Sequence, residues 1–106
     1  MFPEIIKHMT HAENYGVEGL EVYYDYTPVG TLYFFGTKNE FVLPEHMHAE
    51  QWGMVIKGEV TYKYETGETK IYKAGETYSV PANVKHKTFY SADFEEVGYV
   101  DDPNYS

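Results

Sequence analysis

The stretch EHMHAEQWGMVIKGEV, residues 45–60, decides the fold of this chain. His46 and His48 stand two residues apart at the start of a run that is rich in apolar side chains and ends at Gly58. In a β-strand, residues i and i+2 project from the same face, so the two imidazoles point to the same side. Neutral imidazole is a common ligand of transition metals, which makes the pair a candidate metal site. Taken alone, the pair also fits two solvated side chains on an open face.

The rest of the chain reads as short strands separated by turns. The segments rich in β-branched and aromatic residues are 20–26, 31–35, 40–46, 51–58, 60–65, 69–73, 77–80, 86–90 and 95–100. Residues 60–65 alternate between apolar and polar, which is typical of a strand with one buried face. The pattern predicts one antiparallel all-β sandwich or barrel over residues 1–106. We expect an N-terminal arm or short helix over 1–14 and the barrel over 15–102.

Composition excludes several classes of function. The chain has 17 acidic residues against eight lysines and no arginine, for a net charge of −9, so nucleic acid is not an expected partner. It has no cysteine, hence no disulfide framework and no thiolate nucleophile. No apolar run approaches spanning length and no basic amphipathic segment is present, so membrane attachment is not expected. Without a recognisable signal peptide, the expected location is cytoplasmic.

A second segment with a histidine, GETYSVPANVKHKTFY, covers residues 75–90. A short apolar strand leads to the turn Pro81-Ala82-Asn83, which is followed by His86. Turns of this kind require defined backbone angles and fix where the next strand begins. His86 is therefore expected at a fixed corner of the sheet.

Together the two segments resemble the two sequence motifs of the cupin superfamily. The first cupin motif is H-x-H, a third ligand a few residues on, usually glutamate, and a glycine seven residues after that ligand. Those positions are held here by His46, His48, Gln51 and Gly58. The second motif is a glycine, a proline, a turn glycine and the last histidine, and often a closing asparagine. Those positions are held by Gly75, Pro81, Asn83, His86 and Tyr90.

The resemblance implies a small single-domain cupin, a double-stranded β-helix of the jelly-roll type. It also implies one divalent transition metal ion (zinc, nickel, iron, manganese or copper) inside one open end. The implied ligands are His46, His48, Gln51 and His86.

Gln51 departs from the family pattern. Glutamine offers a neutral carbonyl oxygen, so the ion would keep its full charge, which favours Lewis-acid chemistry. Strict alternation from His48 would turn Gln51 to the opposite face, so a bulge or turn at Ala49-Glu50 is needed. Without that break, Glu50 would be the inward ligand.

Asp101 is the candidate catalytic residue. Val97, Tyr99 and Asp101 alternate, which puts an aspartate on a face with two apolar side chains. Its position is similar to that of an aspartate in sugar-acid ring-opening cupins, which also have a glutamine among their ligands. The resemblance implies that Asp101 would move protons while the ion polarises the substrate. A rim aspartate or a turn cap before Pro103 is the alternative.

Three functions are compatible with these residues. The first is a small metal-dependent isomerase, ring-opening enzyme or lyase acting on a sugar, sugar acid or keto compound. The second is a non-catalytic module that binds or senses a ligand, and the third is an iron-dependent dioxygenase. Carboxylate substrates are usually clamped by arginine, so lysine or the ion would have to take that role here.

Other residues are expected to be structural. His8 and His11 are expected at the surface, and Tyr62 and Tyr64 in the core or the barrel lining. Aromatic residues make up 18% of the chain, more than one barrel interior is expected to hide, which predicts a homodimer. Trp52 is expected under the sheet or in that interface.

Overall fold

The computed structural model of the chain describes residues 2–12 and 17–105. The described residues contain ten strands, one 3₁₀ turn η1 (Ile6–His8) and no α-helix. The strands are β1 (Thr10–His11), β2 (Leu20–Tyr26), β3 (Thr31–Thr37), β4 (Phe41–His46), β5 (Gln51–Lys57), β6 (Glu59–Tyr64), β7 (Thr69–Lys73), β8 (Thr77–Val80), β9 (His86–Tyr90) and β10 (Phe94–Val100). The described part of the chain has no helix with the length and hydropathy that a membrane span needs.

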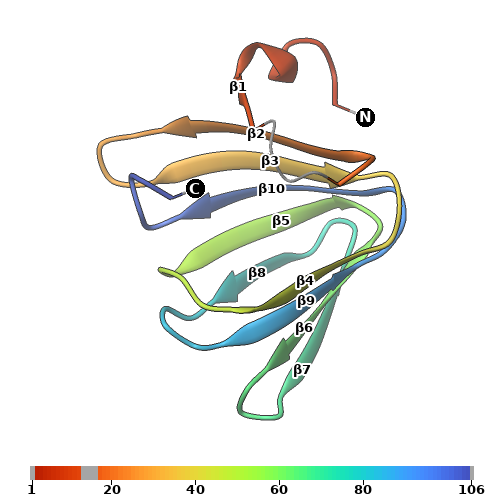
Figure 1. Cartoon of the computed structure of the whole chain (residues 1–106), viewed down its shortest axis with the longest axis vertical. Helices are drawn as coiled ribbons and strands as arrows, with labels where there is room; N and C mark the ends of the chain where they lie inside the picture. Colours follow the sequence, from red (N-terminus) through yellow and green to blue (C-terminus); the bar gives the residue numbers. More distant parts are fainter. Residues whose placement is uncertain (1, 13–16, 106) are drawn as a thin grey trace.

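The strands form two antiparallel sheets that face each other (Figure 1). The larger sheet has the order β1-β2-β3-β10-β5-β8, and the smaller has the order β4-β9-β6-β7. Neighbouring strands are mostly distant in sequence, as β10 between β3 and β5 illustrates. This arrangement is the jelly-roll barrel, so the predicted fold class is confirmed.

The core lies between the two sheets because most of the strands have one apolar face. Burial alternates along β5, β8 and β10, as the two-residue period of a strand requires. The hydrophobic core consists of Val55, Val60, Tyr62, Tyr64, Tyr78, Val80, Tyr90 and Phe94. Half of these residues are tyrosines, whose hydroxyl groups need hydrogen-bond partners inside the barrel.

Two glycines make room for two of the buried tyrosines. Gly53 of β5 and Gly98 of β10 are cross-strand partners, flanked by Tyr78 of β8 and Tyr33 of β3 at the same level. A Cβ atom on Gly98 would overlap the ring and hydroxyl of Tyr33, and one on Gly53 would lie 2.5 Å from Cζ of Tyr78. The two rings therefore lie over the glycines.

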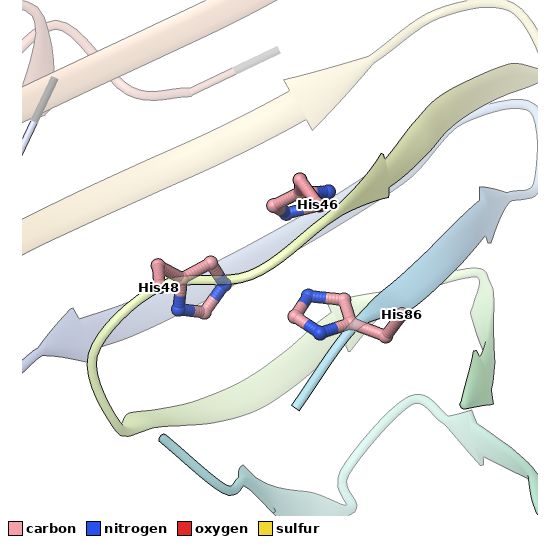
Figure 2. Close-up of side chains that lie close together, drawn as sticks. All are labelled: His46, His48 and His86. Carbon is pink, nitrogen blue, oxygen red and sulfur yellow. The ribbon is translucent and has the colours of Figure 1, made fainter. Parts of the chain in front are cut away.

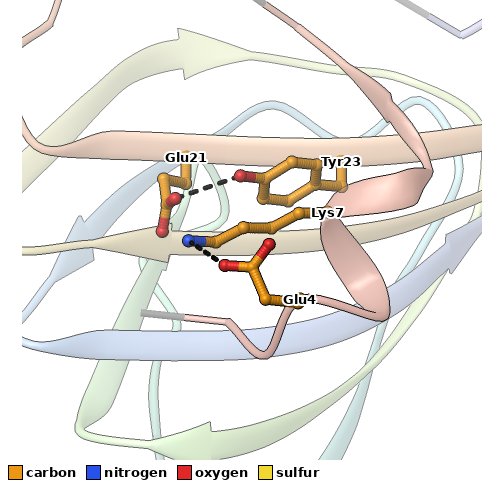
Figure 3. A network of polar contacts seen from close by, with 4 residues as sticks. All are labelled: Glu4, Lys7, Glu21 and Tyr23. Atoms are coloured by element: carbon orange, nitrogen blue, oxygen red, sulfur yellow. Dashed lines mark hydrogen bonds and ion pairs between the residues drawn. The ribbon is translucent and has the colours of Figure 1, made fainter.

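The N-terminal segment packs on the outer side of β2 and β3. Phe2 is buried and makes edge contacts with the rings of Tyr23 and Phe34. Figure 3 shows Glu4, Lys7, Glu21 and Tyr23 gathered where η1 meets β2. The Tyr23 hydroxyl donates to Glu21 at 3.1 Å, and the Lys7 ammonium lies 3.7 Å from the Glu4 carboxylate.

Candidate metal centre

Three histidines from two separate segments converge at one end of the space between the sheets. His46 ends β4, His48 lies in the connection to β5, and His86 begins β9. Their ring centroids are 4.4 Å apart for His46 and His86, 4.9 Å for His48 and His86, and 5.3 Å for His46 and His48. One ligand nitrogen from each lies within 4.8 Å of the others, and Figure 2 shows the three rings facing a common space.

Local backbone structure produces this convergence. The pairing of β4 with β9 shifts register between Leu43 and His46, and His46 then lies directly opposite His86. Asn83 adopts a left-handed conformation with φ of 59°, which asparagine tolerates better than most residues. It therefore serves in the place where the cupin motif has a turn glycine. Its backbone N–H donates to the His48 carbonyl at 2.9 Å and ties the two histidine segments together.

The hydrogen bonds of the rings leave the same nitrogen available on each histidine. The Nδ1 atoms lie 2.8, 2.6 and 2.9 Å from the backbone carbonyls of Pro44, Ala49 and Val84, for His46, His48 and His86 respectively. An Nδ1–H that donates to a carbonyl fixes the tautomer and presents Nε2 as the ligand atom.

His86 gives the clearest sign of a missing partner. Its side chain is 1% exposed, and its Nε2 atom is buried without a hydrogen-bond partner among the described residues. Such a buried polar atom costs free energy unless something binds it. The three ligand nitrogens lie within 4.8 Å of one another, so small side-chain rotations would bring them onto one ion. The residues fit a divalent transition metal.

The electrostatics of the cluster keep two of its rings in the unprotonated form. Burial lowers the pKa of His48 and of His86 below the usual histidine value, and the neighbouring imidazoles lower it further. Both rings are therefore neutral at pH 7. Neutral imidazole is the form that binds a metal.

The structure turns Gln51 inward and Glu50 outward. Residues 47–50 form no strand and bend at Ala49, which supplies the break in alternation that the sequence required. Gln51 is 8% exposed and lines the cavity, whereas Glu50 is exposed. The Gln51 side-chain NH₂ group donates to the Tyr33 hydroxyl, which leaves the amide oxygen available to a cation.

The histidines border a cavity of about 330 Å³ between the sheets. The larger sheet contributes Leu20, Val22, Tyr24, Thr31, Tyr33, Phe35, Gln51, Glu96 and Val100, and the smaller sheet contributes Phe41, Leu43, Tyr62, Thr88 and Tyr90 beside the histidines. Tyr105, near the C-terminus, also lines it and makes an edge contact with the His48 ring.

Glu96 is the functional candidate that the sequence did not reveal. It lies on the inner face of β10, is 1% exposed and lines the cavity. Burial raises its pKa to about 7, although hydrogen bonds from Tyr78 and Tyr33 lower it in part. A carboxyl group with this pKa can take up and release a proton near neutral pH.

Two chains of hydrogen bonds meet at Glu96. In the first, Gln51 donates to the Tyr33 hydroxyl, which donates to Glu96 at 3.1 Å. In the second, the Tyr62 hydroxyl donates to that of Tyr78 at 3.0 Å, and Tyr78 donates to the other oxygen of Glu96. The buried carboxyl group is thus connected to the predicted ligand Gln51.

The structure does not bring Asp101 to the cavity. Asp101 follows the end of β10 with an exposed side chain, and its backbone N–H donates to the Glu50 carbonyl at 2.9 Å. Val97 and Tyr99 lie on the outer face of β10, whereas Glu96 and Val100 are buried on the inner face. Sequence alternation was ambiguous because both faces of this strand carry apolar side chains. The apolar character of Phe94 and Val100 was the signal that pointed to the face of Glu96.

The remaining expectations concern residues outside the centre. His8 and His11 are exposed, and Tyr62 and Tyr64 are buried in the core, as predicted. Trp52 faces away from Gln51 and is 45% exposed on the outer side of the larger sheet.

Fold and site together define a jelly-roll barrel with three histidines clustered at one end. The Cupin domain family matches residues 37–98, which is more than half of the chain, so the chain belongs to the cupin family. The resemblance seen in its two histidine motifs is thereby confirmed.

Solved structures agree on the fold. KdgF from Halomonas sp. is 16% identical with a TM-score of 0.71, covering 92% of this chain and 91% of that one. A variant of oxalate decarboxylase from Bacillus subtilis is 15% identical with a TM-score of 0.77, covering 95% of this chain. This chain spans only 29% of that decarboxylase, which has Mn(II) centres. No curated protein sequence matches the chain.

Proposed function

We propose that this cupin is a metal-dependent enzyme that moves a proton on a small oxygenated molecule. The observation that carries the proposal is Glu96, a buried carboxyl group with a pKa of about 7 that lines the same cavity as the three histidines. A module that only binds a ligand has no need of such a group, and burying it costs stability. Perturbed carboxyl groups in cavities are typical of acid–base catalysis.

His46, His48 and His86 would hold the ion, with the Gln51 amide oxygen as the fourth ligand. When bound, a divalent ion with neutral ligands supplies Lewis acidity toward a carbonyl or hydroxyl oxygen. Its identity is open, since imidazole suits zinc, nickel, iron and copper alike, and the decarboxylase relative has Mn(II) centres.

Glu96 would provide the proton transfer. Its carboxylate takes a proton from the carbon beside the polarised carbonyl, and the carboxylic acid returns it to a neighbouring carbon or to a departing oxygen. The first outcome is an isomerisation and the second is a ring opening or elimination, and neither needs an oxidant. Tyr33 and Tyr78 hold the carboxyl group in place through their hydrogen bonds.

Asp101 is the second candidate for this proton transfer, on the strength of the resemblance to sugar-acid ring-opening cupins. Its exposed position outside the cavity lining favours Glu96. Two further functions remain as outcomes of the test: a binding module, which would hold a ligand unchanged, and an iron-dependent dioxygenase, which would consume oxygen.

Solvent exchange tests the proposal even while the complete reaction is unidentified. Metal-loaded protein is incubated in D₂O with a panel of ketoses, uronates and hydroxyketones, and deuterium uptake beside the carbonyl is followed by NMR. We expect exchange that falls at least 100-fold in Glu96→Gln with unchanged metal content. The matched control is Glu95→Gln on the same strand, and Asp101→Asn tests the alternative. Exchange that persists in Glu96→Gln but disappears in Asp101→Asn would reverse the assignment, and no turnover with any compound would favour the binding module.

We also propose that the chain forms a homodimer through the outer face of the larger sheet. Trp52, Met54 and Ile56 of β5 are all exposed there, and Tyr99 and Val97 of β10 lie opposite the first two. An apolar patch on a sheet face is typical of a subunit interface.

A further inference from the structure

The cavity offers no cation to an anionic substrate. None of its lining residues is a lysine, and the chain has no arginine. All eight lysines are exposed. The acidic side chain in the lining, Glu96, would repel a carboxylate whenever it is ionised. The bound ion would therefore be the only positively charged partner for a carboxylate substrate in the cavity. Sites that bind carboxylates normally supply a cationic side chain as well.

Several hydroxyl groups in the lining already have partners, whereas the Thr88 hydroxyl has none among the described residues. The Tyr33 hydroxyl is engaged by Gln51 and Glu96, the Tyr62 hydroxyl by Tyr78, and the Thr31 hydroxyl by the Asp102 carbonyl. A polyol would lose its bonds to water and find few replacements. Each unpaired buried hydroxyl costs about 1–3 kcal/mol, so several of them would prevent binding.

The remaining wall of the cavity is apolar. Leu20 and Val22 of β2, Phe35 of β3, and Phe41 and Leu43 of β4 line it, and the Phe35 and Phe41 rings are 6.5 Å apart. Strand register separates this wall from the ligand end. Gln51 and Thr31 lie at the level of Val100, whereas Phe35 lies at the level of Glu96, four residues earlier in β10.

We infer that the substrate is a neutral molecule with an apolar, ring-sized body and one oxygenated end, in preference to a sugar or a sugar acid. The inference deepens the proposed function and rests on it. The oxygenated end meets the histidines and the Gln51 amide, the apolar body lies against Leu20, Val22, Phe35, Phe41 and Leu43, and the Glu96 carboxyl group lies between the two. A cavity of about 330 Å³ is at the small end of ligand sites, which fits one ring with a short substituent.

A competition between three probes tests this inference. Calorimetry and ligand-observed NMR measure the dissociation constants of 2-hydroxyacetophenone, D-xylose and D-galacturonate with zinc-loaded protein and with metal-free protein. The first probe has a neutral ring body and adjacent carbonyl and hydroxyl groups, the second is a neutral polyol and the third is its acidic counterpart. We expect 2-hydroxyacetophenone to bind at least 10-fold more tightly than either sugar. Equal or tighter binding of galacturonate or xylose would overturn the inference.

Two adjacent residues of β4 provide a matched pair of variants. Leu43 lines the cavity, whereas Val42 is exposed on the opposite face of the strand. Leu43→Ala should weaken binding of 2-hydroxyacetophenone at least 5-fold with unchanged zinc content, and Val42→Ala should leave it unchanged. Equal effects of the two variants would overturn the inference. Zinc content is measured separately from probe binding. Loss of zinc would count against the proposed function, whereas the relative dissociation constants of the three probes test the substrate class.

Discussion

The hydroxyl group of Tyr33 donates a hydrogen bond to the carboxyl group of Glu96 at 3.1 Å, and the same hydroxyl accepts one from Gln51. One phenol thus joins the buried acid to the predicted ligand Gln51. Tyr33 can take this position because Gly98, its cross-strand neighbour, has no side chain. The packing of the tyrosine ring over the glycine therefore also positions the hydroxyl group that bonds the buried carboxyl group of the cavity.

The raised pKa of Glu96 predicts a specific dependence of stability on pH. Glu96 has a pKa of about 7 in the folded chain against 4.5 as its ordinary value, so the folded chain binds its proton more tightly than the unfolded chain does. Its contribution is fully present below pH 4.5 and is lost as the pH rises through about 7. The loss is on the order of 3 kcal/mol.

Urea unfolding between pH 4.5 and pH 8, with a chelator present, measures this effect. The free energy of unfolding of Glu96→Gln relative to wild type should rise with pH over this range, because the variant has no carboxyl group to ionise. His48 and His86 titrate in both proteins, so their contribution cancels in the difference. A difference that is constant with pH would contradict a raised pKa.

The packing of tyrosine over glycine predicts that Gly98→Ala is destabilising. The added Cβ atom would overlap the Tyr33 ring, and overpacking of this kind costs about 1–3 kcal/mol. The double variant Gly98→Ala/Tyr33→Ala should be more stable than the sum of the two single effects, because removing the ring removes the overlap. Urea unfolding of all four proteins measures the coupling, and additive effects would show that the two residues do not interact.

Most of the fold could be predicted because strands leave a local signal. All nine segments expected as strands are strands in the structure, and 20–26, 69–73, 77–80 and 86–90 match residue for residue. The two-residue strand β1 was not expected, because it forms only by pairing with β2 and has no pattern of its own. The clustering of the three histidines could be predicted from the two motifs, because a turn and the register between paired strands fix the positions of these histidines.

The buried acid could not be predicted because it depends on contacts between distant segments. Glu96 is stabilised in the interior by tyrosines from β3 and β8, and neither lies near it in sequence. A glutamate in a strand is normally solvated, so the local sequence pattern favoured Asp101 as the candidate catalytic carboxylate. Which face of β10 points inward was decided by its pairing with β3 and β5.

The inward orientation of Gln51 predicts that Gln51→Glu tightens metal binding. A carboxylate in this position adds a negative charge next to the ion, and we expect affinity to rise about 10-fold. Competition with a chromogenic chelator measures the change. Glu50→Gln is the control, since Glu50 is exposed, and it should bind metal as wild type does. A loss of affinity in Glu50→Gln would make Glu50 the ligand instead.

The exposed apolar face of β5 predicts that Trp52→Glu converts the proposed homodimer to a monomer. A buried charge without a partner on both sides of a symmetric interface strongly opposes association. Ile71→Glu is the control, because Ile71 is also exposed but lies on β7 of the other sheet. Analytical ultracentrifugation distinguishes the states. A wild-type chain that sediments as a monomer would contradict the proposed dimer.

The most direct test of the account is the metal content of the purified chain and of His86→Ala, measured by elemental analysis and by titration with zinc. We predict one divalent ion per wild-type chain and at least a 100-fold loss of affinity in His86→Ala, whose far-ultraviolet circular dichroism should remain that of a β-barrel. His8→Ala, which removes an exposed histidine far from the cluster in sequence, should bind as wild type does. A wild-type chain that binds no divalent ion, or a His86→Ala variant that binds it undiminished, would contradict the assignment of a metal centre to these three histidines.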